Sequence, residues 1–466
     1  MVATESFDLV VRGGTVVTAK EEFDADVGIV DGRIAAVAPG LRGRDEIDAS
    51  GLMILPGGVD PHVHFSTLDP PGTPGWVDDF WSGTRAAAAG GITTVGNMVY
   101  PWPGQTLLQA LERDRATAER DAVIDVAFHP VLTDPATQPL SEIPTLAAMG
   151  HTSLKYFMSF GGFTVTPEPY LEAMRLANDE RMLTLIHCED AALLADAMSV
   201  LVASGRTAPV FYPESRPVTV EVAATARAAA FANQTQAPTY VVHLSSAGAL
   251  EEVRRGRARG APMWIETRPM YLFLTEERFA EPDAGKYFGQ PPLRTTHDRE
   301  ALWQALVDGE IDTVATDHAP WLYADKTAPG LDITSSPPGV ADLDVMLPML
   351  WSEGVTTGRI SRQRFVGLSS TNAARLLGLY PRKGTIAPGS DADLVLWDPA
   401  ESRPVQAARF ASNSDYSPYE DWPVTGWPRM TISRGEIIVR DGNVDAQRGR
   451  GRVPRRERLQ TLVRHS

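Results

Sequence analysis

Two kinds of apolar segment alternate along the middle of the 466-residue chain. Short runs rich in β-branched residues predict buried strands, and Ala-rich segments such as "FWSGTRAAAAGG" predict helices between them. Eight such strands are expected, at 59–65, 93–99, 122–130, 152–158, 182–188, 239–245, 263–268 and 311–318. Strand and helix repetition is typical of a parallel α/β sheet, and eight units of this size predict a (β/α)8 TIM-like barrel. The alternative is an open doubly wound sheet, which would need a Gly-rich phosphate-binding turn that we do not find.

The two ends of the chain have a different pattern, with short apolar runs separated by Gly-centred turns. Asp31-Gly32 lies between two apolar runs and signals a hairpin, and "DADLVLWDP" and "RMTISRGEIIVRDGNV" have the same character near the other end. We therefore expect the ends to join into one small β-sandwich domain. The predicted division is 1–57 and 381–445 for this domain, 58–380 for the catalytic barrel, and 446–466 for a basic tail that is solvated or touches a neighbouring subunit.

Charge and composition narrow the range of partners. The net charge is −16, from 43 Lys and Arg against 59 Asp and Glu, which disfavours nucleic acid. The apolar runs are too short for a membrane span, and the first residues do not resemble a signal peptide. The single cysteine, Cys188, excludes an internal disulfide and a Cys-based metal cluster. We expect a cytoplasmic protein without a membrane partner.

Metal-competent side chains fall at or near the carboxyl ends of the predicted strands. This is the face where barrels of this kind build their active sites. The candidates are His62, His64, Lys155, His187, His243 and Asp317. His62 and His64 are two residues apart, so in a strand both point to the same side and can hold one ion. Each histidine taken alone is better explained as a structural residue, but this explanation weakens for four of them together. Cys188 is expected to be a small buried residue, and His318 is expected to support a neighbouring ligand or the fold rather than to bind metal.

Lys155 is a basic residue inside the apolar run "TSLKYFMSF". A buried ammonium is costly, so this lysine must be paired with a carboxylate, neutral or modified. A neutral amine can add carbon dioxide to form a carbamate, an anionic ligand able to bridge two cations. Four imidazoles, one carboxylate and one carbamate suit two divalent metal ions, most simply zinc.

With these residues in view, the chain resembles the amidohydrolase superfamily, in the branch of cyclic amidohydrolases that contains hydantoinases, dihydropyrimidinases and allantoinases. The resemblance extends over nearly the whole chain. It is carried by "LPGGVDPHVHF", "SLKYFM", "IHCED", "VVHLSSAGAL", "IETRPMYL", "QPPLR", "ATDHAP" and "YSPYEDWPVTG".

The resemblance implies a zinc-dependent enzyme that hydrolyses the C–N bond of a small cyclic amide and opens the ring to an N-carbamoyl amino acid. It also implies imidazole ligation by His62, His64, His187 and His243, and a carboxylated Lys155 as the bridge. A metal-bridging hydroxide would be the nucleophile, and Asp317 would be both a ligand and the proton shuttle. Members of this branch are commonly homotetramers, so we expect a homotetramer or a homodimer.

Substrate contacts are expected from Phe160, Gln290, Ser335, Phe65 and Trp76. Three of these depart from the pattern of the resembled enzymes: Phe160 stands where a tyrosine is usual, Gln290 where a serine is usual, and Ser335 where an asparagine is usual. Phe65 and Trp76 are candidates for an apolar substituent pocket. Ser66 replaces the arginine typical of dihydroorotases and argues against that activity.

Three other functions are weighed against hydantoinase activity. Allantoinase and a cyclic-imide hydrolase of unusual specificity are alternatives within the enzyme class. A non-catalytic scaffold is the alternative outside it, but all six ligand positions are filled here.

Overall fold

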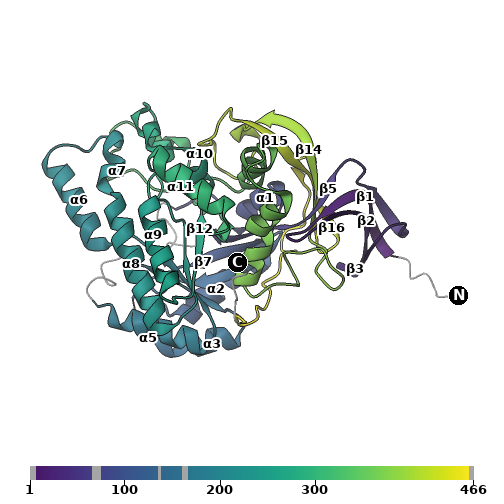
Figure 1. Cartoon of the computed structure of the whole chain (residues 1–466), viewed down its shortest axis with the longest axis horizontal. Coiled ribbons are helices and arrows are strands. Elements are labelled where there is room, and N and C mark those ends of the chain that lie inside the picture. The colour runs from purple at the N-terminus through teal and green to yellow at the C-terminus, as the bar shows by residue number, and fades with distance from the viewer. Residues whose placement is uncertain (1–6, 66–74, 135–137, 160–165, 461–466) are drawn as a thin grey trace.

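Eight parallel strands form the centre of the molecule in a computed structural model that describes residues 7–65, 75–134, 138–159 and 166–460 (Figure 1). The eight strands match the eight predicted segments. They are β6 (Gly58–Val63), β7 (Ile92–Val99), β8 (Asp125–Pro130), β9 (Ser153–Phe157), β10 (Leu183–His187), β11 (Thr239–Val241), β12 (Met263–Thr267) and β13 (Thr313–Val314).

The strands close into a ring in the order of the sequence. β6 to β8 form one hydrogen-bonded group and β9 to β13 another, with parallel pairing throughout. Single parallel bridges join the two groups at both ends, between Val63 and His318 and between Val131 and Lys155. The predicted (β/α)8 barrel is therefore confirmed.

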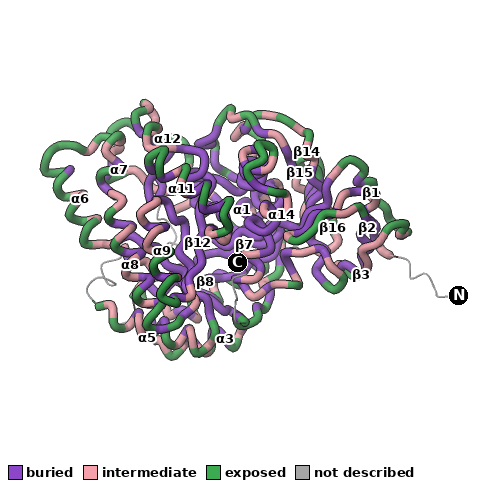
Figure 2. The backbone as a smooth tube through the Cα atoms, viewed as in Figure 1, coloured by how far each residue is buried: buried purple, intermediate pink, exposed green. Residues whose placement is uncertain are grey.

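Burial explains the continuous apolar runs of these strands. Every residue of β7 and β10 is buried, as expected for parallel strands that are covered on both faces. Figure 2 shows the buried strands at the centre, with exposed positions on the outer helices.

Helices cover the outside of the barrel. Several begin at a side-chain cap that the sequence provides, such as Asp79 before α1, Thr106 before α2 and Thr295 before α11. The helices are α1 (Phe80–Ala89), α2 (Leu107–Asp121), α3 (Ile143–Ala148), α5 (Glu168–Asp179), α6 (Ala191–Ala203), α7 (Tyr212–Ser215), α8 (Val218–Thr235), α9 (Ala247–Ala258), α10 (Pro269–Phe273), α11 (Thr296–Val307), α12 (Tyr323–Thr327), α13 (Met346–Leu350), α14 (Arg362–Val366) and α15 (Asn372–Leu376).

The two ends of the chain meet in a second, nine-stranded sheet beside the barrel (Figure 1). Strand β5 pairs antiparallel with β14, which brings Ile54 opposite Leu396 and joins the N-terminal to the C-terminal half of the sheet. The strands are β1 (Phe7–Val17), β2 (Glu22–Val30), β3 (Arg33–Ala38), β4 (Gly43–Asp48), β5 (Met53–Pro56), β14 (Leu394–Pro404), β15 (Pro423–Ser433), β16 (Glu436–Arg440) and β17 (Asn443–Val444). The exact domain boundaries at 57, 380 and 445 stay predictions.

A buried ionic cluster connects this sheet to the barrel. Lys383 lies 2.8 Å from Asp125 at the start of β8, 2.6 Å from Asp393 and 3.2 Å from Asp391. Arg434, in the turn after β15, also pairs with Asp125. The cluster lies at the amino ends of the barrel strands, on the side opposite the candidate site.

The C-terminal segment, residues 446–460, runs along the same side of the barrel. The backbone of Arg452 accepts from the Val126 N–H, and the Leu459 N–H donates to Arg181. Arg456 is buried, and its guanidinium donates to the Phe128 carbonyl at 2.8 Å. The expectation of a solvated tail is therefore wrong for residues 446–460. Polar groups of this segment form hydrogen bonds with the barrel on the side of the amino ends of its strands, which we call the lower rim.

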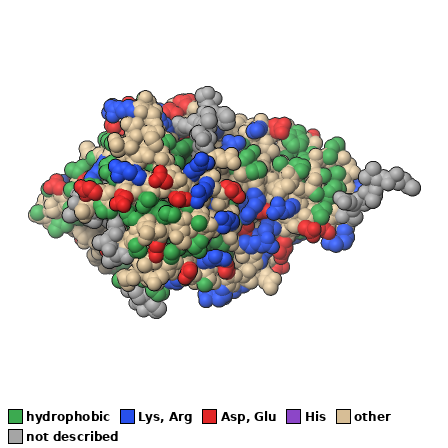
Figure 3. All heavy atoms as spheres, turned by 90° about the horizontal axis from the view of Figure 1, so that it is seen from below, with side chains coloured by type: hydrophobic (Ala, Val, Ile, Leu, Met, Phe, Trp, Pro, Cys, Tyr) green, Lys and Arg blue, Asp and Glu red, His purple; other side chains and the backbone are tan. Residues whose placement is uncertain are grey.

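The surface carries charges of both signs. On the face in Figure 3, Lys and Arg side chains lie among Asp and Glu side chains. Among the described residues, no helix has both the length and the apolar character needed to cross a membrane.

Candidate metal centre

The six predicted ligands come together at the carboxyl end of the barrel. His62 lies in β6, Lys155 in β9 and His187 at the end of β10, while His64, His243 and Asp317 follow the ends of β6, β11 and β13 by one, two and three residues. Five of them, all except Lys155, border a cavity of about 110 Å³. The cavity is lined by His62, His64, Trp76, Tyr100, Phe157, His187, His243, Gln290, Asp317, Ala319, Pro338 and Gly339.

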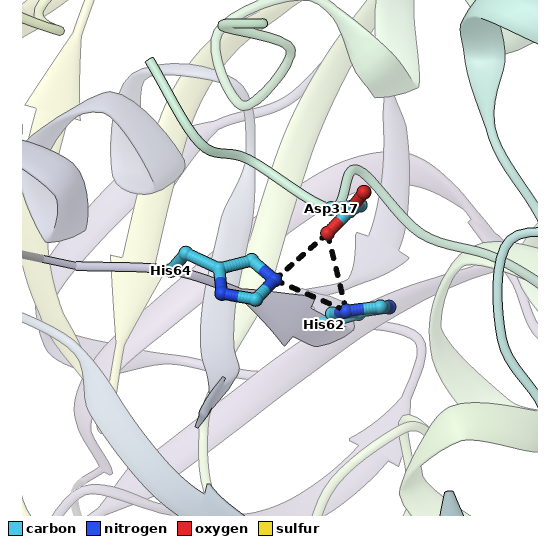
Figure 4. A group of neighbouring side chains, drawn as sticks. All are labelled: His62, His64 and Asp317. Atoms are coloured by element: carbon cyan, nitrogen blue, oxygen red, sulfur yellow. Dashed lines mark hydrogen bonds and ion pairs between the residues drawn. The ribbon is translucent and has the colours of Figure 1, made fainter. Parts of the chain in front are cut away.

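His62, His64 and Asp317 form the tightest group (Figure 4). Asp317 Oδ1 lies 2.8 Å from His64 Nε2 and 3.2 Å from His62 Nε2, and the two ring nitrogens are 3.3 Å apart. All three side chains are buried. Two imidazole nitrogens and a carboxylate oxygen that converge in this way can hold one divalent cation.

His187 and His243 form a second pair on the neighbouring strands. Nδ1 of His187 lies 2.9 Å from Nε2 of His243. Burial lowers the pKa of both rings, and the nearby Glu189 only partly offsets this for His187. Both are therefore neutral imidazoles, which is the form that binds metal ions.

Backbone conformation is unusual at two of the predicted ligands. His243 has φ 39° and Asp317 has φ 49°, in the left-handed region that residues with a side chain rarely adopt. Such strain is found mainly at functional sites, where the surrounding structure maintains it.

Lys155 is fully buried, and its Nζ has no hydrogen-bond partner among the described residues. No carboxylate of the described part of the chain lies within ion-pair distance, and the nearest aromatic contact is the Phe157 ring, with its centroid 4.7 Å from Nζ. Burial lowers the pKa of Lys155 to about 8. The paired-carboxylate explanation therefore lacks a partner, while a neutral amine is accessible near neutral pH.

Two of the candidate ligand histidines have a carboxylate partner at the ring nitrogen that faces away from the other candidate ligands, and the sequence analysis missed both partners. Glu266 lies 2.8 Å from His62 Nδ1, and Glu189 lies 2.7 Å from His187 Nε2. Such partners fix the imidazole tautomer and leave the opposite nitrogen free for an ion. Glu189 could have been predicted from the sequence as a partner of His187, because it lies only two residues after it.

Glu189 is itself held by a buried arginine. Arg216 donates to both of its oxygens, at 2.9 and 2.5 Å. Burial opposes ionisation of Glu189, but Arg216 outweighs it and holds the pKa at about 2. Glu189 is therefore ionised near neutral pH and can accept a hydrogen bond from the His187 Nε2–H.

Asp317 also has an arginine partner. Arg268 Nη1 donates to its Oδ2 at 2.8 Å, from a side chain that is fully buried. Burial disfavours the carboxylate, but Arg268 and the two histidines hold the pKa of Asp317 well below its usual range. Asp317 is thus ionised, with Oδ1 facing the histidines.

The predicted substrate contacts have different outcomes. Trp76 and Gln290 line the cavity, whereas Phe160 lies outside the described residues. Phe65 is a core residue instead, because alternate residues of an extended chain point to opposite sides and His64 already faces the cavity. Its ring is 1% exposed and packs edge-on against Phe80. Ser335 is also not a lining residue, since its hydroxyl turns back to Asp332 at 3.1 Å.

Two aromatic lining residues, Tyr100 and Phe157, were not predicted, and neither were the lining residues Ala319, Pro338 and Gly339. Phe157 follows Lys155 by two residues and so points to the same side of β9. Cys188 and His318 are structural, as expected: burial raises the pKa of the Cys188 thiol to about 12, and His318 pairs with Asp78 at 2.8 Å.

Comparisons with known proteins agree with this arrangement. The sequence pattern of the Amidohydrolase family matches residues 53–438. D-phenylhydantoinase of Escherichia coli O9:H4 (strain HS) is 38% identical over 455 residues, which cover 96% of this chain and 98% of that protein.

Solved structures are similar over almost the whole chain. D-hydantoinase (dihydropyrimidinase) from Thermus sp. has a TM-score of 0.92 at 34% identity, covering 97% of this chain and 99% of that one. L-hydantoinase (dihydropyrimidinase) from Arthrobacter aurescens has a TM-score of 0.88 at 29% identity, covering 96% and 99%.

Proposed function

This chain belongs to the amidohydrolase family, and from that membership we propose that it is a metal-dependent hydrolase of cyclic amides. The reaction is cleavage of a ring C–N bond in a hydantoin- or dihydropyrimidine-like substrate, with an N-carbamoyl amino acid as product. The observation that carries the proposal is the convergence of four buried histidines, Asp317 and Lys155 at the carboxyl end of a barrel whose relatives are named hydantoinases.

The donor set fits two divalent ions, which we propose to be zinc. His62, His64 and Asp317 would hold one side of the centre and His187 and His243 the other. Bound there, the ions would supply Lewis acidity toward the scissile carbonyl and would lower the pKa of water.

Lys155 would supply the bridging ligand as a carbamate. Its unpartnered amine adds to carbon dioxide, forming an N–C bond and releasing one proton, and the carbamate product carries one negative charge that is shared by two oxygens. Burial favours the neutral amine that this addition requires.

Asp317 would be the proton carrier. Its Oδ2 is occupied by Arg268, which leaves Oδ1 toward the cavity and fixes the orientation of the carboxylate. As an anion, it can accept a proton from the attacking water and then deliver it to the leaving ring nitrogen.

A ring-opening screen tests the proposal. The protein is produced with zinc and bicarbonate, and its metal content is measured. It is then incubated with hydantoin, 5-phenylhydantoin, dihydrouracil, allantoin and a cyclic imide, and products are identified by mass. We expect opening of a 5-substituted hydantoin to the N-carbamoyl amino acid.

Other outcomes of the screen reject the proposal or correct it. If the protein opens only allantoin, it is an allantoinase, and if it opens only the imide, it is a cyclic-imide hydrolase. Metal-replete protein that opens no ring contradicts the proposal, and protein that binds no divalent metal indicates the scaffold function. The predicted cytoplasmic location and the homotetramer or homodimer are separate proposals, and light scattering tests the assembly.

A further inference from the structure

Tyr100 is the one residue with a hydroxyl group among the described residues that line the cavity. It directly follows β7, so it stands at the carboxyl end of the barrel beside the candidate ligands. Its ring lies in an aromatic corner, with centroids 5.9 Å from His64, 6.2 Å from Trp76 and 5.9 Å from Phe157. This packing limits the positions that the hydroxyl can take.

The direction of its hydrogen bond follows from the role of His64. Nε2 of His64 faces Asp317 and His62, so an imidazole that binds an ion through this nitrogen carries its proton on Nδ1. Tyr100 Oη lies 3.3 Å from that Nδ1. In this arrangement the His64 N–H donates and the Tyr100 oxygen accepts.

The O–H of Tyr100 then has no acceptor among the described residues. Among the described residues, His64 is the only hydrogen-bond partner of Tyr100 Oη. Since the side chain lines the cavity, the free O–H can be satisfied by an acceptor that enters it.

We propose that Tyr100 donates a hydrogen bond to a carbonyl oxygen of the bound ring, which makes it a catalytic residue. The proposal rests on the proposed function, because it takes the cyclic amide as the ligand. A carbonyl oxygen gains negative charge as its carbon is attacked, and a donor already in place stabilises that charge. Tyr100 thus has two bonds of opposite direction, accepting from a metal ligand and donating to the substrate.

The substitution Tyr100→Phe tests this, because it keeps the ring and removes only the hydroxyl. The matched control is Tyr287→Phe, which removes a hydroxyl that bonds to Glu281 at 2.8 Å outside the cavity. Three quantities are measured on the metal-loaded proteins: metal content, the Kd of N-carbamoylphenylglycine by calorimetry, and kcat and KM for 5-phenylhydantoin.

We expect Tyr100→Phe to keep the metal content of the unsubstituted protein. Product binding should weaken at least fivefold, and kcat/KM should fall by roughly 10²-fold, near the loss typical of one such donor. Tyr287→Phe should match the unsubstituted protein in all three measurements.

Two results would overturn the proposal. Loss of metal in Tyr100→Phe would mean that the hydroxyl only positions His64, and unchanged binding and turnover would mean that it has no contact with the ring. If the unsubstituted protein opens rings while Tyr100→Phe equals it, only this inference fails. If the unsubstituted protein opens none, the proposed function fails as well.

Discussion

Arg268 and Asp317, at the ends of the neighbouring strands β12 and β13, are joined by a hydrogen bond of 2.8 Å between Nη1 and Oδ2. Arg268 is fully buried and also lies 3.9 Å from Asp342. One buried cation therefore serves two buried carboxylates, and one of them is the proposed proton carrier.

Removing this cation should destabilise the fold strongly. Arg268→Met leaves Asp317 and Asp342 buried without a counter-charge, so the free energy of unfolding should fall by about 3–5 kcal/mol. Urea unfolding measures the change. Arg254→Met is the control, since it removes an exposed pair with Glu310 and should cost at most about 1 kcal/mol. Equal losses of unfolding free energy in the two variants would contradict the role of Arg268 as the counter-charge of Asp317 and Asp342.

Asp317→Asn should abolish most turnover. An amide cannot accept the proton from the attacking water, so kcat should fall by roughly 10³-fold or more while the protein stays folded by circular dichroism. Metal content is measured in parallel, because Asp317 also belongs to the His62 and His64 group. Near-normal turnover in a metal-replete variant would rule out the proton-carrier role.

Lys155 should carry the mass of one added carbon dioxide under native conditions. Peptide mapping locates the modification, and Lys155→Ala should lose both the added mass and divalent metal. Lys326 is an internal control, because it is equally buried but donates to the carbonyls of Phe288, Pro337 and Gly339. The added mass on Lys326, or its absence from Lys155 in the metal-replete protein, would reject the proposed bridge.

Glu189→Gln should weaken metal binding about 10- to 100-fold. The neutral amide is a poorer acceptor for the His187 N–H and leaves Arg216 without its anion, so the ring is held less firmly. Chelator competition measures the affinity. Glu214→Gln removes the partner of the exposed Arg206 and should leave metal affinity unchanged. If Glu189→Gln behaves like this control, Glu189 does not support the centre.

Acid should weaken the junction between barrel and sheet. Burial works against ionisation of Asp125, but Lys383 and Arg434 hold its pKa below the usual range. An unfolded Asp has a pKa of about 3.9, so Asp125 contributes stability above that pH and loses it as the pH falls through its lower folded value.

Unfolding free energies measured between about pH 6 and pH 2 test this expectation. Asp125→Asn should be less stable at neutral pH and should lose less stability on acidification. Asp441→Asn, at an exposed position paired with Arg429, should keep the full acid dependence. If Asp125→Asn loses as much stability on acidification as the unsubstituted protein, carboxylates other than Asp125 cause the acid dependence.

The barrel and its candidate metal ligands could be predicted because two simple sequence patterns indicate them. Buried parallel strands are continuous apolar runs, and a polar residue near the end of such a run, such as His187 or Lys155, is conspicuous. The β-bridge between Val63 and His318 then follows from the closure of the eight strands into a barrel, although no local sequence pattern predicts it.

The predictions that failed depended on side-chain direction and on loop paths. Alternation should have assigned Phe65 to the core once His64 was placed at the cavity. Tyr100 follows a strand, where aromatic residues are usually core, and only the contact with His64 distinguishes it. Ser335 lies in a long connection after β13, whose path the residue types do not determine.

The C-terminal segment has a consequence for biosynthesis. Its backbone hydrogen bonds with the lower rim of the barrel come from residues 451–459, and β14 must pair with β5 before the N-terminal strands have a complete sheet. A ribosome makes these residues after the barrel strands and after β5, so the emerging chain holds barrel strands without these hydrogen bonds and an unpaired edge of β5 until they have been made. During that interval the unpaired edge and exposed surface favour association between nascent chains, and chaperone demand should be highest until the C-terminal segment has paired.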